Sequence, residues 1–216
     1  MDPQQSGAQP DGGRTARKRR AILAAATEVF LQNGYLGASM DEVAAKAAVS
    51  KQTVYKQFAD KKHLFAEIIL GTTAQLVDGF EQTYGSVLDE ATDPRQALRD
   101  LARVFLANLT RPDVLQLRRL VIAEADRFPD ISGAWFERGF HQSLVLLGEA
   151  LERLADRGLL RRPADPTLAA YQFAGLVMYK PMNQLMFAGT HAGPDPEELD
   201  HIADQAAEAF LAAYGV

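Results

Sequence analysis

The 216-residue sequence contains no cysteine. This excludes disulfides, cysteine zinc sites, iron–sulfur clusters and thiol catalysis. The four histidines are scattered without the H-E-x-x-H spacing, so no metal site is expected. Glycine-rich phosphate loops, nucleophile elbows and paired-carboxylate motifs are also missing. We therefore expect neither catalytic residues nor a cofactor, and the sequence does not favour an enzyme.

Long apolar runs are missing as well. No stretch reaches about eighteen consecutive apolar residues, the length that spans a bilayer. The first thirteen residues, MDPQQSGAQPDGG, are polar and lack the apolar core of a signal peptide. We expect residues 1–13 to be a flexible tail and the protein to be cytoplasmic. A composition of 47% hydrophobic and 24% charged residues predicts a folded core rather than disorder.

Positive charge is concentrated in one segment of an acidic chain. The formal net charge is −5, yet residues 14–62 hold ten Lys and Arg against four Asp and Glu. A local basic excess predicts a surface that binds a polyanion such as nucleic acid. If charge were the only signal, a solvated charged face would explain it equally well.

Apolar side chains recur with a period near 3.6 residues in almost every patterned stretch, and no alternating run rich in Val, Ile and Thr is present. We expect an all-α protein of about nine helices. The first should stop at residues 33–34. Further helices are expected at about 39–47, 51–58, from 60, from 93, within 112–129, and at 135–157, 165–188 and 196–214.

Cap residues mark several of these helix starts. The sequence from Ser39 to Glu42 has the spacing of a capping box, in which each side chain bonds a free amide of the other residue. Ser50 and Asp60 are placed to cap the next two helices. Asp-Pro pairs at 93–94, 165–166 and 195–196 predict three more starts, the last as a capping box.

Two short helices joined by a tight turn over residues 39–58 predict a helix-turn-helix. On the second helix, Val54 and Phe58 are four residues apart and should point inward. Lysine and tyrosine side chains suit phosphate oxygens, whereas Gln52 and Thr53 can contact base edges. A polar, solvent-facing helix is the alternative. The residues left for a DNA groove are Lys51, Gln52, Thr53, Tyr55 and Lys56.

Residues 21–65, AILAAATEVFLQNGYLGASMDEVAAKAAVSKQTVYKQFADKKHLF, resemble the DNA-binding domain of the TetR/AcrR family of bacterial transcriptional regulators. The first-helix Ala/Phe stripe, the Gly34-Tyr35 turn and the motifs at 49–51 and 53–55 carry the resemblance. Two positions depart from the family pattern. Ala48 stands where the family commonly has glycine, which implies a tolerated backbone or a slightly altered turn. Gln52 stands where a small residue is common, which implies a changed base preference.

The resemblance implies a helix-turn-helix DNA-binding domain at 14–62 and a helical ligand-binding and dimerisation domain at 63–216. It also implies a homodimer that places one recognition helix per subunit in successive major grooves of a near-palindromic operator. Ser39 is then expected to cap its helix and meet a phosphate, and Lys61 to contact a phosphate at the start of helix four. Tyr55 as a core residue is the alternative to a DNA contact. The basic residues expected to form an arm toward the DNA backbone or minor groove are Arg17, Lys18, Arg19 and Arg20.

In the resembled family, the last two helices form the dimer interface. Here these are the helices expected at 165–188 and 196–214. Small and apolar residues at spacings of three and four suit a close helix approach, although packing within one chain would use the same pattern. They are Leu168, Tyr171, Gln172, Ala174, Gly175, Val177 and Met178 on the first helix, with Phe187, Ile202, Ala206, Ala209 and Phe210 completing the surface.

The resemblance also implies a small-ligand pocket in the C-terminal domain. Residues 117–129 resemble a stretch found in the ligand-binding domains of one AcrR-like branch. Core packing is the alternative for the apolar candidates, and a surface Arg–Glu pair or a helix histidine for the polar ones. The apolar candidates are Phe105, Leu109, Trp135, Phe136, Phe140, Tyr179 and Met182, and the polar ones are Arg118, Arg119, Glu124 and His141.

We therefore expect a ligand-responsive transcriptional repressor that binds its operator as a dimer and is released by a small apolar or aromatic effector. Two alternatives stay open. One is a helical enzyme that uses a carboxylate or His141. The other is a helical small-molecule-binding or interaction protein whose helix-turn-helix is not used for specific DNA binding.

Overall fold

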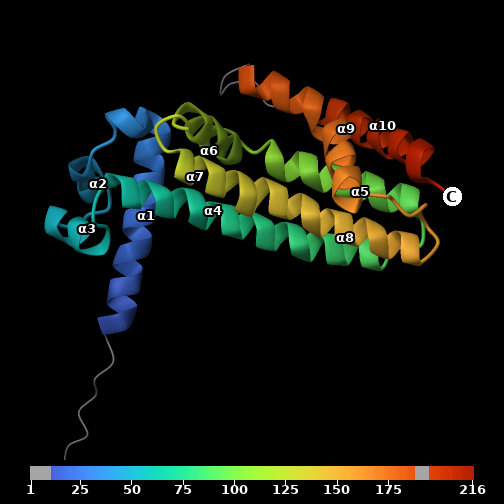
Figure 1. Cartoon of the computed structure of the whole chain (residues 1–216). Coiled ribbons are helices and arrows are strands. Elements are labelled where there is room, and N and C mark those ends of the chain that lie inside the picture. Colours follow the sequence, from blue (N-terminus) through green and yellow to red (C-terminus); the bar gives the residue numbers. More distant parts are fainter. Residues whose placement is uncertain (1–10, 188–194) are drawn as a thin grey trace, which may run out of the picture. The chain divides into compact units, whose positions relative to one another are not determined.

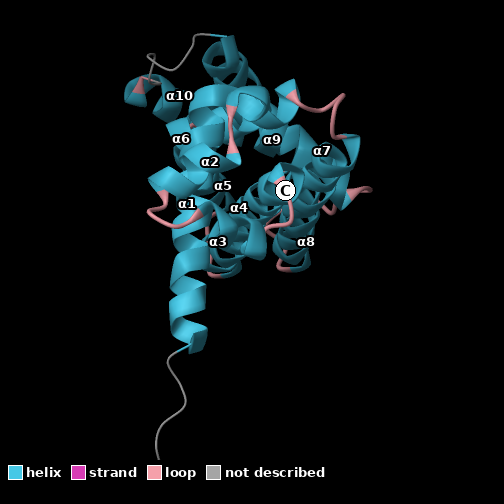
Figure 2. Cartoon of the chain, turned by 90° about the vertical axis from the view of Figure 1, so that its left-hand side faces the viewer, coloured by secondary structure: helices cyan, strands magenta, loops and turns pink. Residues whose placement is uncertain are grey.

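The computed structural model describes residues 11–187 and 195–216, and this part of the chain consists of helices joined by turns (Figures 1 and 2). The chain divides into two compact units, with bounds Met1–Ile69 and Leu70–Val216. We call these the N-terminal and C-terminal units. No helix in the described ranges is long and apolar enough to cross a membrane. The all-α fold class expected from the sequence is confirmed.

The N-terminal unit contains α1 (Asp11–Gly37), α2 (Met40–Lys46), α3 (Lys51–Gln57) and the first residues of α4 (Lys61–Tyr84). The first helix begins at Asp11, so three residues of the expected tail are helical, while residues 1–10 lie outside the described part. Gly34, with φ +69°, interrupts the helical backbone of α1 at the expected stop. A glycine serves there because side chains rarely tolerate this conformation.

Helix starts in this unit are capped as the sequence predicts. The Ser39 hydroxyl accepts from the Glu42 amide at 3.1 Å, and the Ser50 hydroxyl accepts from the Thr53 amide at 3.2 Å. Asp60 accepts from the His63 amide at 2.8 Å, and this bond lowers the pKa of the Asp60 carboxyl.

In the predicted capping box, the Glu42 carboxylate would also accept from the Ser39 amide, but Glu42 makes a different contact. The Glu42 carboxylate instead accepts from the Asn33 side-chain amide at 2.9 and 3.0 Å. Glu42 therefore connects α2 to α1 rather than closing its own helix start.

The C-terminal unit contains α5 (Pro94–Leu109), α6 (Pro112–Ala123), α7 (Pro129–Trp135), α8 (Gln142–Asp156), α9 (Pro166–Phe187) and α10 (Pro196–Tyr214). Two π-helical segments, η1 (Gly85–Asp89) and η2 (Phe136–His141), continue α4 and join α7 to α8. With these continuations joined, the described residues form nine helical runs. Each of the three Asp-Pro pairs caps a helix, through Asp93, Asp165 and Asp195.

Two boundaries differ from the sequence prediction. The helix expected at 135–157 begins earlier, at Pro129, because α7 and η2 run directly into α8. The segment expected to be helical up to 129 ends at Ala123, and residues 124–128 form a turn in which the Phe128 amide bonds the Glu124 carbonyl at 2.9 Å. Residue 188, the expected end of α9, lies outside the described residues.

The core of the C-terminal unit lies where α8 packs on α9 and α10 packs on α5 and α9. Leu98, Leu147 and Phe173 are fully buried there. Gly148 permits the contact between α8 and α9, because a Cβ at this position would lie 2.9 Å from the Pro166 backbone. On the surface, α5 and α10 are joined by three ion pairs, Arg95–Glu208, Arg99–Asp204 and Arg103–Asp200.

Gly148→Ala is expected to lower the free energy of unfolding by about 1–3 kcal/mol, because the backbone at Pro166 cannot give way as a flexible side chain would. Urea denaturation measures the change. Gly79→Ala in α4 is the control, because nothing lies within 4 Å of its Cβ position. It should raise stability by up to about 1 kcal/mol. Equal stability of the two variants would contradict the close approach of α8 to α9.

The turn between α2 and α3 contains the one described non-glycine residue with positive φ, Ala48, at φ +52°. The Ala48 amide bonds the Ala45 carbonyl at 3.1 Å, and the Val49 amide bonds the Ala44 carbonyl at 3.0 Å. The left-handed conformation is therefore kept with alanine in place, at an energetic cost that glycine would not incur.

Ala48→Gly is expected to stabilise this turn by about 0.5–1 kcal/mol, because glycine adopts positive φ without steric cost. Ala47, at φ −76°, offers the matched control, and Ala47→Gly should destabilise the turn. Native-state hydrogen exchange at the Val49 and Val54 amides reads out both changes. A slower exchange in Ala47→Gly than in Ala48→Gly would be incompatible with the left-handed turn.

Candidate nucleic-acid interface and small-molecule cavity

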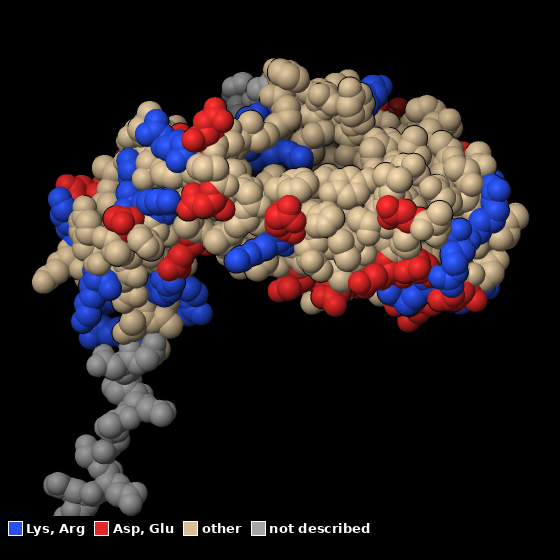
Figure 3. Space-filling model, viewed as in Figure 1, with Lys and Arg blue, Asp and Glu red and all other residues tan. Residues whose placement is uncertain are grey.

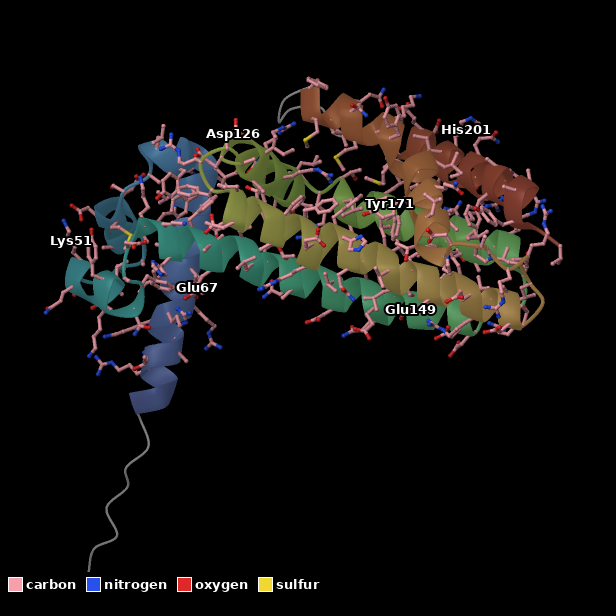
Figure 4. The ribbon with its side chains drawn as sticks, viewed as in Figure 1. Lys51, Glu67, Asp126, Glu149, Tyr171 and His201 are labelled. Atoms are coloured by element: carbon pink, nitrogen blue, oxygen red, sulfur yellow. The ribbon has the colours of Figure 1, made fainter. Side chains whose placement is uncertain are left out.

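Helix α3 presents a polar face because its apolar side chains are anchored below it. Val54 is fully buried, and Phe58, at the end of the helix, is 2% exposed. The opposite face carries the exposed side chains of Lys51, Gln52 and Lys56. Figure 4 labels Lys51 on the helix-turn-helix, beside α2 and α3. The structure thus brings the predicted recognition residues to one surface.

Tyr55 and Thr53 differ in how far they reach that surface. Tyr55 is 45% exposed, so the alternative that it is a core residue is not what the structure shows. Thr53 is partly buried, and its hydroxyl lies 2.8 Å from the Ser50 hydroxyl. Tyr55 therefore stands free to contact DNA, while Thr53 is held at the helix start.

The two lysines of α3 have different electrostatic surroundings. The Lys51 ammonium lies 2.7 Å from the Asp41 carboxylate of α2, and this interaction raises the pKa of Lys51. Lys56 is exposed and has no ion pair with a described residue. Lys56 therefore offers an uncompensated positive charge, whereas the charge of Lys51 is partly neutralised.

Lys61 lies at the start of α4 and holds the end of α1. Its ammonium donates to the Tyr35 and Ala38 carbonyls, both at 2.8 Å, and lies 4.5 Å from the centre of the Tyr35 ring. These carbonyls belong to the end of α1, where helical acceptors lack partners. A phosphate contact by Lys61 stays a prediction, and it would require these hydrogen bonds to be exchanged.

The basic residues Arg17, Lys18, Arg19 and Arg20 do not form an extended arm. They lie within α1, because no proline or glycine separates Gly13 from Ala21 and the intervening residues include strong helix formers. Arg19 pairs with Glu67, and its guanidinium lies 4.6 Å from the centre of the Phe58 ring. The other three make no ion pair with the described residues. Figure 3 shows Lys and Arg gathered around this end of α1.

A cavity of about 320 Å³ lies within the C-terminal unit. Its walls come from α4, α5, α6, α7, η2, α8 and α9. Seven of the eleven pocket candidates in our sequence prediction line it: Phe105, Leu109, Arg118, Trp135, Phe140, Tyr179 and Met182. Its size and largely apolar lining are typical of small-molecule sites.

Four candidates lie outside the cavity wall. Glu124 caps the end of α6 and pairs with Arg127 at 3.0 Å. Phe136 is 43% exposed and stacks on the His141 ring. The His141 Nδ1 lies 3.0 Å from the hydroxyl of Tyr171. His141 therefore contacts a cavity-lining residue but does not line the cavity itself. Arg119 also points elsewhere, since it donates to the Leu185 carbonyl.

Helix α4 provides a wall of the cavity that was not predicted from the sequence. Its cavity residues recur at the spacing of one helical face, which is the signal that could have identified them. Gly139 and Tyr171 also line the cavity, and Gly139 shows how closely the wall is packed. A Cβ at Gly139 would lie 2.6 Å from the Thr73 methyl group. The α4 residues are Thr73, Leu76, Val77, Phe80 and Tyr84.

Several residues predicted for a dimer surface are instead internal. Ala174 and Met178 are buried at the cavity wall. Gly175 also lines the cavity, but it is exposed. Val177, Ala206 and Phe210 are buried in the core, because α8 and α10 cover that side of α9. The apolar residues that α9 leaves exposed are Leu168, Leu176, Tyr179 and Phe187, with exposed fractions of 53, 45, 76 and 88%.

Two family profiles match the chain. The profile of bacterial regulatory proteins of the tetR family matches residues 22–68, and that of the AefR-like transcriptional repressor C-terminal domain matches residues 96–216. A solved TetR-family transcriptional regulator from Mesorhizobium loti MAFF303099 is 45% identical, with a TM-score of 0.88, over 94% of this chain and 99% of that one.

More distant relatives are also similar. The Flavonoid-responsive Regulator FrrA is 27% identical, with a TM-score of 0.71, over 93% of this chain and 98% of that one. The HTH-type transcriptional activator FasR from Mycolicibacterium smegmatis is 39% identical over 88 residues. That alignment covers 41% of this chain and 38% of FasR, so the chain matches less than two thirds of this curated relative. Since one profile covers the helix-turn-helix and the other more than half of the chain, the protein belongs to the TetR family of DNA-binding transcriptional regulators.

Proposed function

We propose that the protein is a ligand-responsive repressor that binds a near-palindromic operator as a homodimer and leaves it when a small apolar or aromatic effector occupies the cavity. The observation that carries this proposal is a polar, exposed face on α3 in a chain that also holds an apolar cavity of about 320 Å³. Action on chromosomal DNA would place the protein in the cytoplasm.

On the DNA side, the proposed contacts are of two kinds. Gln52 is exposed on the first turn of α3, where amide groups can bond base edges in the major groove. Lys56 and the exposed basic residues of α1 suit phosphate oxygens, which position the protein without reading sequence. Ser39 and Lys51 would add backbone contacts from the two helix starts.

On the ligand side, α4 supplies the proposed lever. This helix begins at Lys61 and contributes five residues to the cavity, from Thr73 to Tyr84. An effector that fits one arrangement of these residues better than another shifts the population toward it, by no more than its difference in affinity. Release follows if the preferred arrangement separates the recognition helices by a distance that no longer matches the half-sites.

The relatives support repression and an aromatic effector. The C-terminal profile is that of AefR-like repressors, and FrrA is described as flavonoid-responsive. FasR is an activator, so the direction of the response is part of the test.

The experiment is a DNA-binding titration of the purified protein on the DNA upstream of its own gene, at several salt concentrations and with random duplex as competitor. Two-fold-symmetric protection supports the proposal. Equal affinity for upstream and random DNA would refute it and leave a helical ligand-binding protein as the remaining reading.

Gln52→Ala and Lys56→Ala are expected to affect binding differently. Gln52→Ala should relax sequence preference and cost about 1–3 kcal/mol on the preferred site, because a base contact is lost. Lys56→Ala should weaken binding to all sequences alike and reduce the slope of log K against log salt by about one. Arg138→Ala, an exposed arginine of η2, is the control and should change neither. A uniform loss in Gln52→Ala would assign this residue to the DNA backbone instead.

The proposed dimer forms through the exposed side of α9 together with α10. Leu168, Leu176 and Tyr179 lie along one side of α9, and small residues of α10 such as Ala209 and Ala212 are exposed as well. Exposed apolar side chains in a row are typical of subunit interfaces. A two-fold axis would bring the two helices of each subunit together as a four-helix contact.

Leu176→Glu is expected to weaken dimerisation at least tenfold, because it places two like charges close to the two-fold axis. Leu176 does not line the cavity, so ligand binding within a subunit should survive. Ile122→Glu is the matched control, since Ile122 is 59% exposed on α6 and belongs to no proposed interface. Sedimentation velocity measures both variants. An unchanged dimer in Leu176→Glu would place the interface elsewhere.

A further inference from the structure

The cavity is electrically asymmetric. Of the described residues that line it, Arg118 alone carries a full charge, and none is an Asp or Glu. The remaining wall consists of apolar and aromatic side chains with a few hydroxyl and amide groups. An arginine in such surroundings carries a positive charge that no acidic group of the wall balances.

The Arg118 guanidinium is held by aromatic rings rather than by an acid. Its central carbon lies 5.6 Å from the centre of the Trp135 ring and 5.8 Å from that of Phe140. No described residue forms an ion pair with it. Burial lowers the pKa of Arg118, with no acidic neighbour to oppose the effect. Its hydrogen-bond donors are therefore available to a molecule in the cavity.

The charged residues near Arg118 in the sequence already have partners, whereas Arg118 has no ion pair with a described residue. Arg119 donates to the Leu185 carbonyl, and Arg127 pairs with Glu124 at 3.0 Å. Glu124 is the acidic residue that the sequence analysis grouped with Arg118, but it does not line the cavity. An unpaired cation removed from water lowers stability unless a partner arrives.

We propose that the cavity takes an amphipathic organic monoanion, whose carboxylate or equivalent anionic group binds Arg118 while its apolar body lies against the aromatic wall. This inference rests on the proposed function, because it names the chemical class of the effector. Guanidinium and carboxylate form paired, charge-assisted hydrogen bonds. The apolar body would contact Phe80, Phe105 and Phe140, which line the same cavity.

The cavity wall also disfavours a cationic ligand. Aromatic rings attract cations, but here Trp135 and Phe140 already face the Arg118 guanidinium, so a cationic ligand would meet a like charge. A neutral ligand would leave that guanidinium without an anionic partner. An amphipathic monoanion can therefore contact the apolar wall and pair with the Arg118 guanidinium at the same time.

The test compares two fluorescent dyes that share one aromatic skeleton. The first, 1-anilinonaphthalene-8-sulfonate, is a monoanion whose sulfonate stands in for a carboxylate, and the second, N-phenyl-1-naphthylamine, lacks that group. Each is titrated into the full-length protein and into the Arg118→Met variant, which keeps an unbranched apolar side chain. Arg138→Met is the matched control, because Arg138 is exposed in η2 and does not line the cavity.

Arg118→Met is expected to weaken binding of the anionic dye about ten- to a hundredfold, the range for losing a charge-assisted contact, and to leave the neutral dye within about threefold. Arg138→Met should bind both dyes as the unaltered protein does. Arg118→Lys should recover part of the lost affinity, since it restores the charge but not the planar pair of donors.

Three results would overturn the proposal: equal affinity of Arg118→Met and the unaltered protein for the anionic dye, an equal loss for both dyes, and no binding of the anionic dye by the unaltered protein. Thermal unfolding without ligand separates a structural role from a binding role. The binding role predicts that Arg118→Met melts at the same or a higher temperature, because an unpaired, partly buried charge is removed. A lower melting temperature together with equal losses for both dyes would assign Arg118 to packing.

The dye titrations contain no DNA, so their outcome is independent of operator binding. If the protein does not bind the anionic dye selectively, the monoanion proposal fails and the proposed regulator function is unaffected. If the protein does not bind upstream DNA specifically, the proposed regulator function fails and the anion selectivity of the cavity is unaffected.

Discussion

The packing of α9 against α8 and α10 is the contact on which the C-terminal unit depends. One side of α9 buries Phe173 and Val177 in the core, and the adjoining side supplies Ala174 and Met178 to the cavity. The remaining side leaves Leu176 exposed. A single helix therefore belongs to the core, the cavity and a free surface at once. Gly148 allows this arrangement, because any side chain there would meet the start of α9.

In the N-terminal unit, aromatic side chains of α1 and α4 form a cluster. Phe30, Tyr35 and Phe65 have ring centres between 5.3 and 5.9 Å apart. Lys61 adds a cation over the Tyr35 ring and closes the end of α1. The orientation of the polar face of α3 follows from the burial of Val54 and Phe58 rather than from the polar residues themselves.

The sequence predicted the parts of the fold that depend on local chemistry. The caps at Ser39, Ser50 and Asp60 were identifiable because a side-chain oxygen and a free amide need only a few residues of chain. The α4 wall of the cavity was missed, because a face that borders a cavity and one that borders the core have the same apolar period. Likewise, no sequence rule separates the exposed side of α9 from its buried sides when all carry apolar residues.

The charged residues show the same limit more clearly. Arg118 and Arg119 are adjacent and identical, and the sequence predicts the same polar role for both. In the structure one faces the cavity and the other bonds the Leu185 carbonyl, because neighbouring residues of a helix point about 100° apart. Which of two such residues meets a cavity depends on packing between distant segments.

The ion pairs between α5 and α10 bear on which helices are free to move. Arg95, Arg99 and Arg103 are spaced four residues apart on α5, and their partners Glu208, Asp204 and Asp200 are spaced four apart in the opposite direction. Each exposed pair contributes at most about 1 kcal/mol, yet together they match in one alignment only. Sliding α10 by one turn would leave an arginine at one end and an acid at the other without partners. The ion pairs therefore hold α5 and α10 in one alignment. Any movement of helices that accommodates a ligand in the cavity is then expected in the helices that lack such a set of ion pairs.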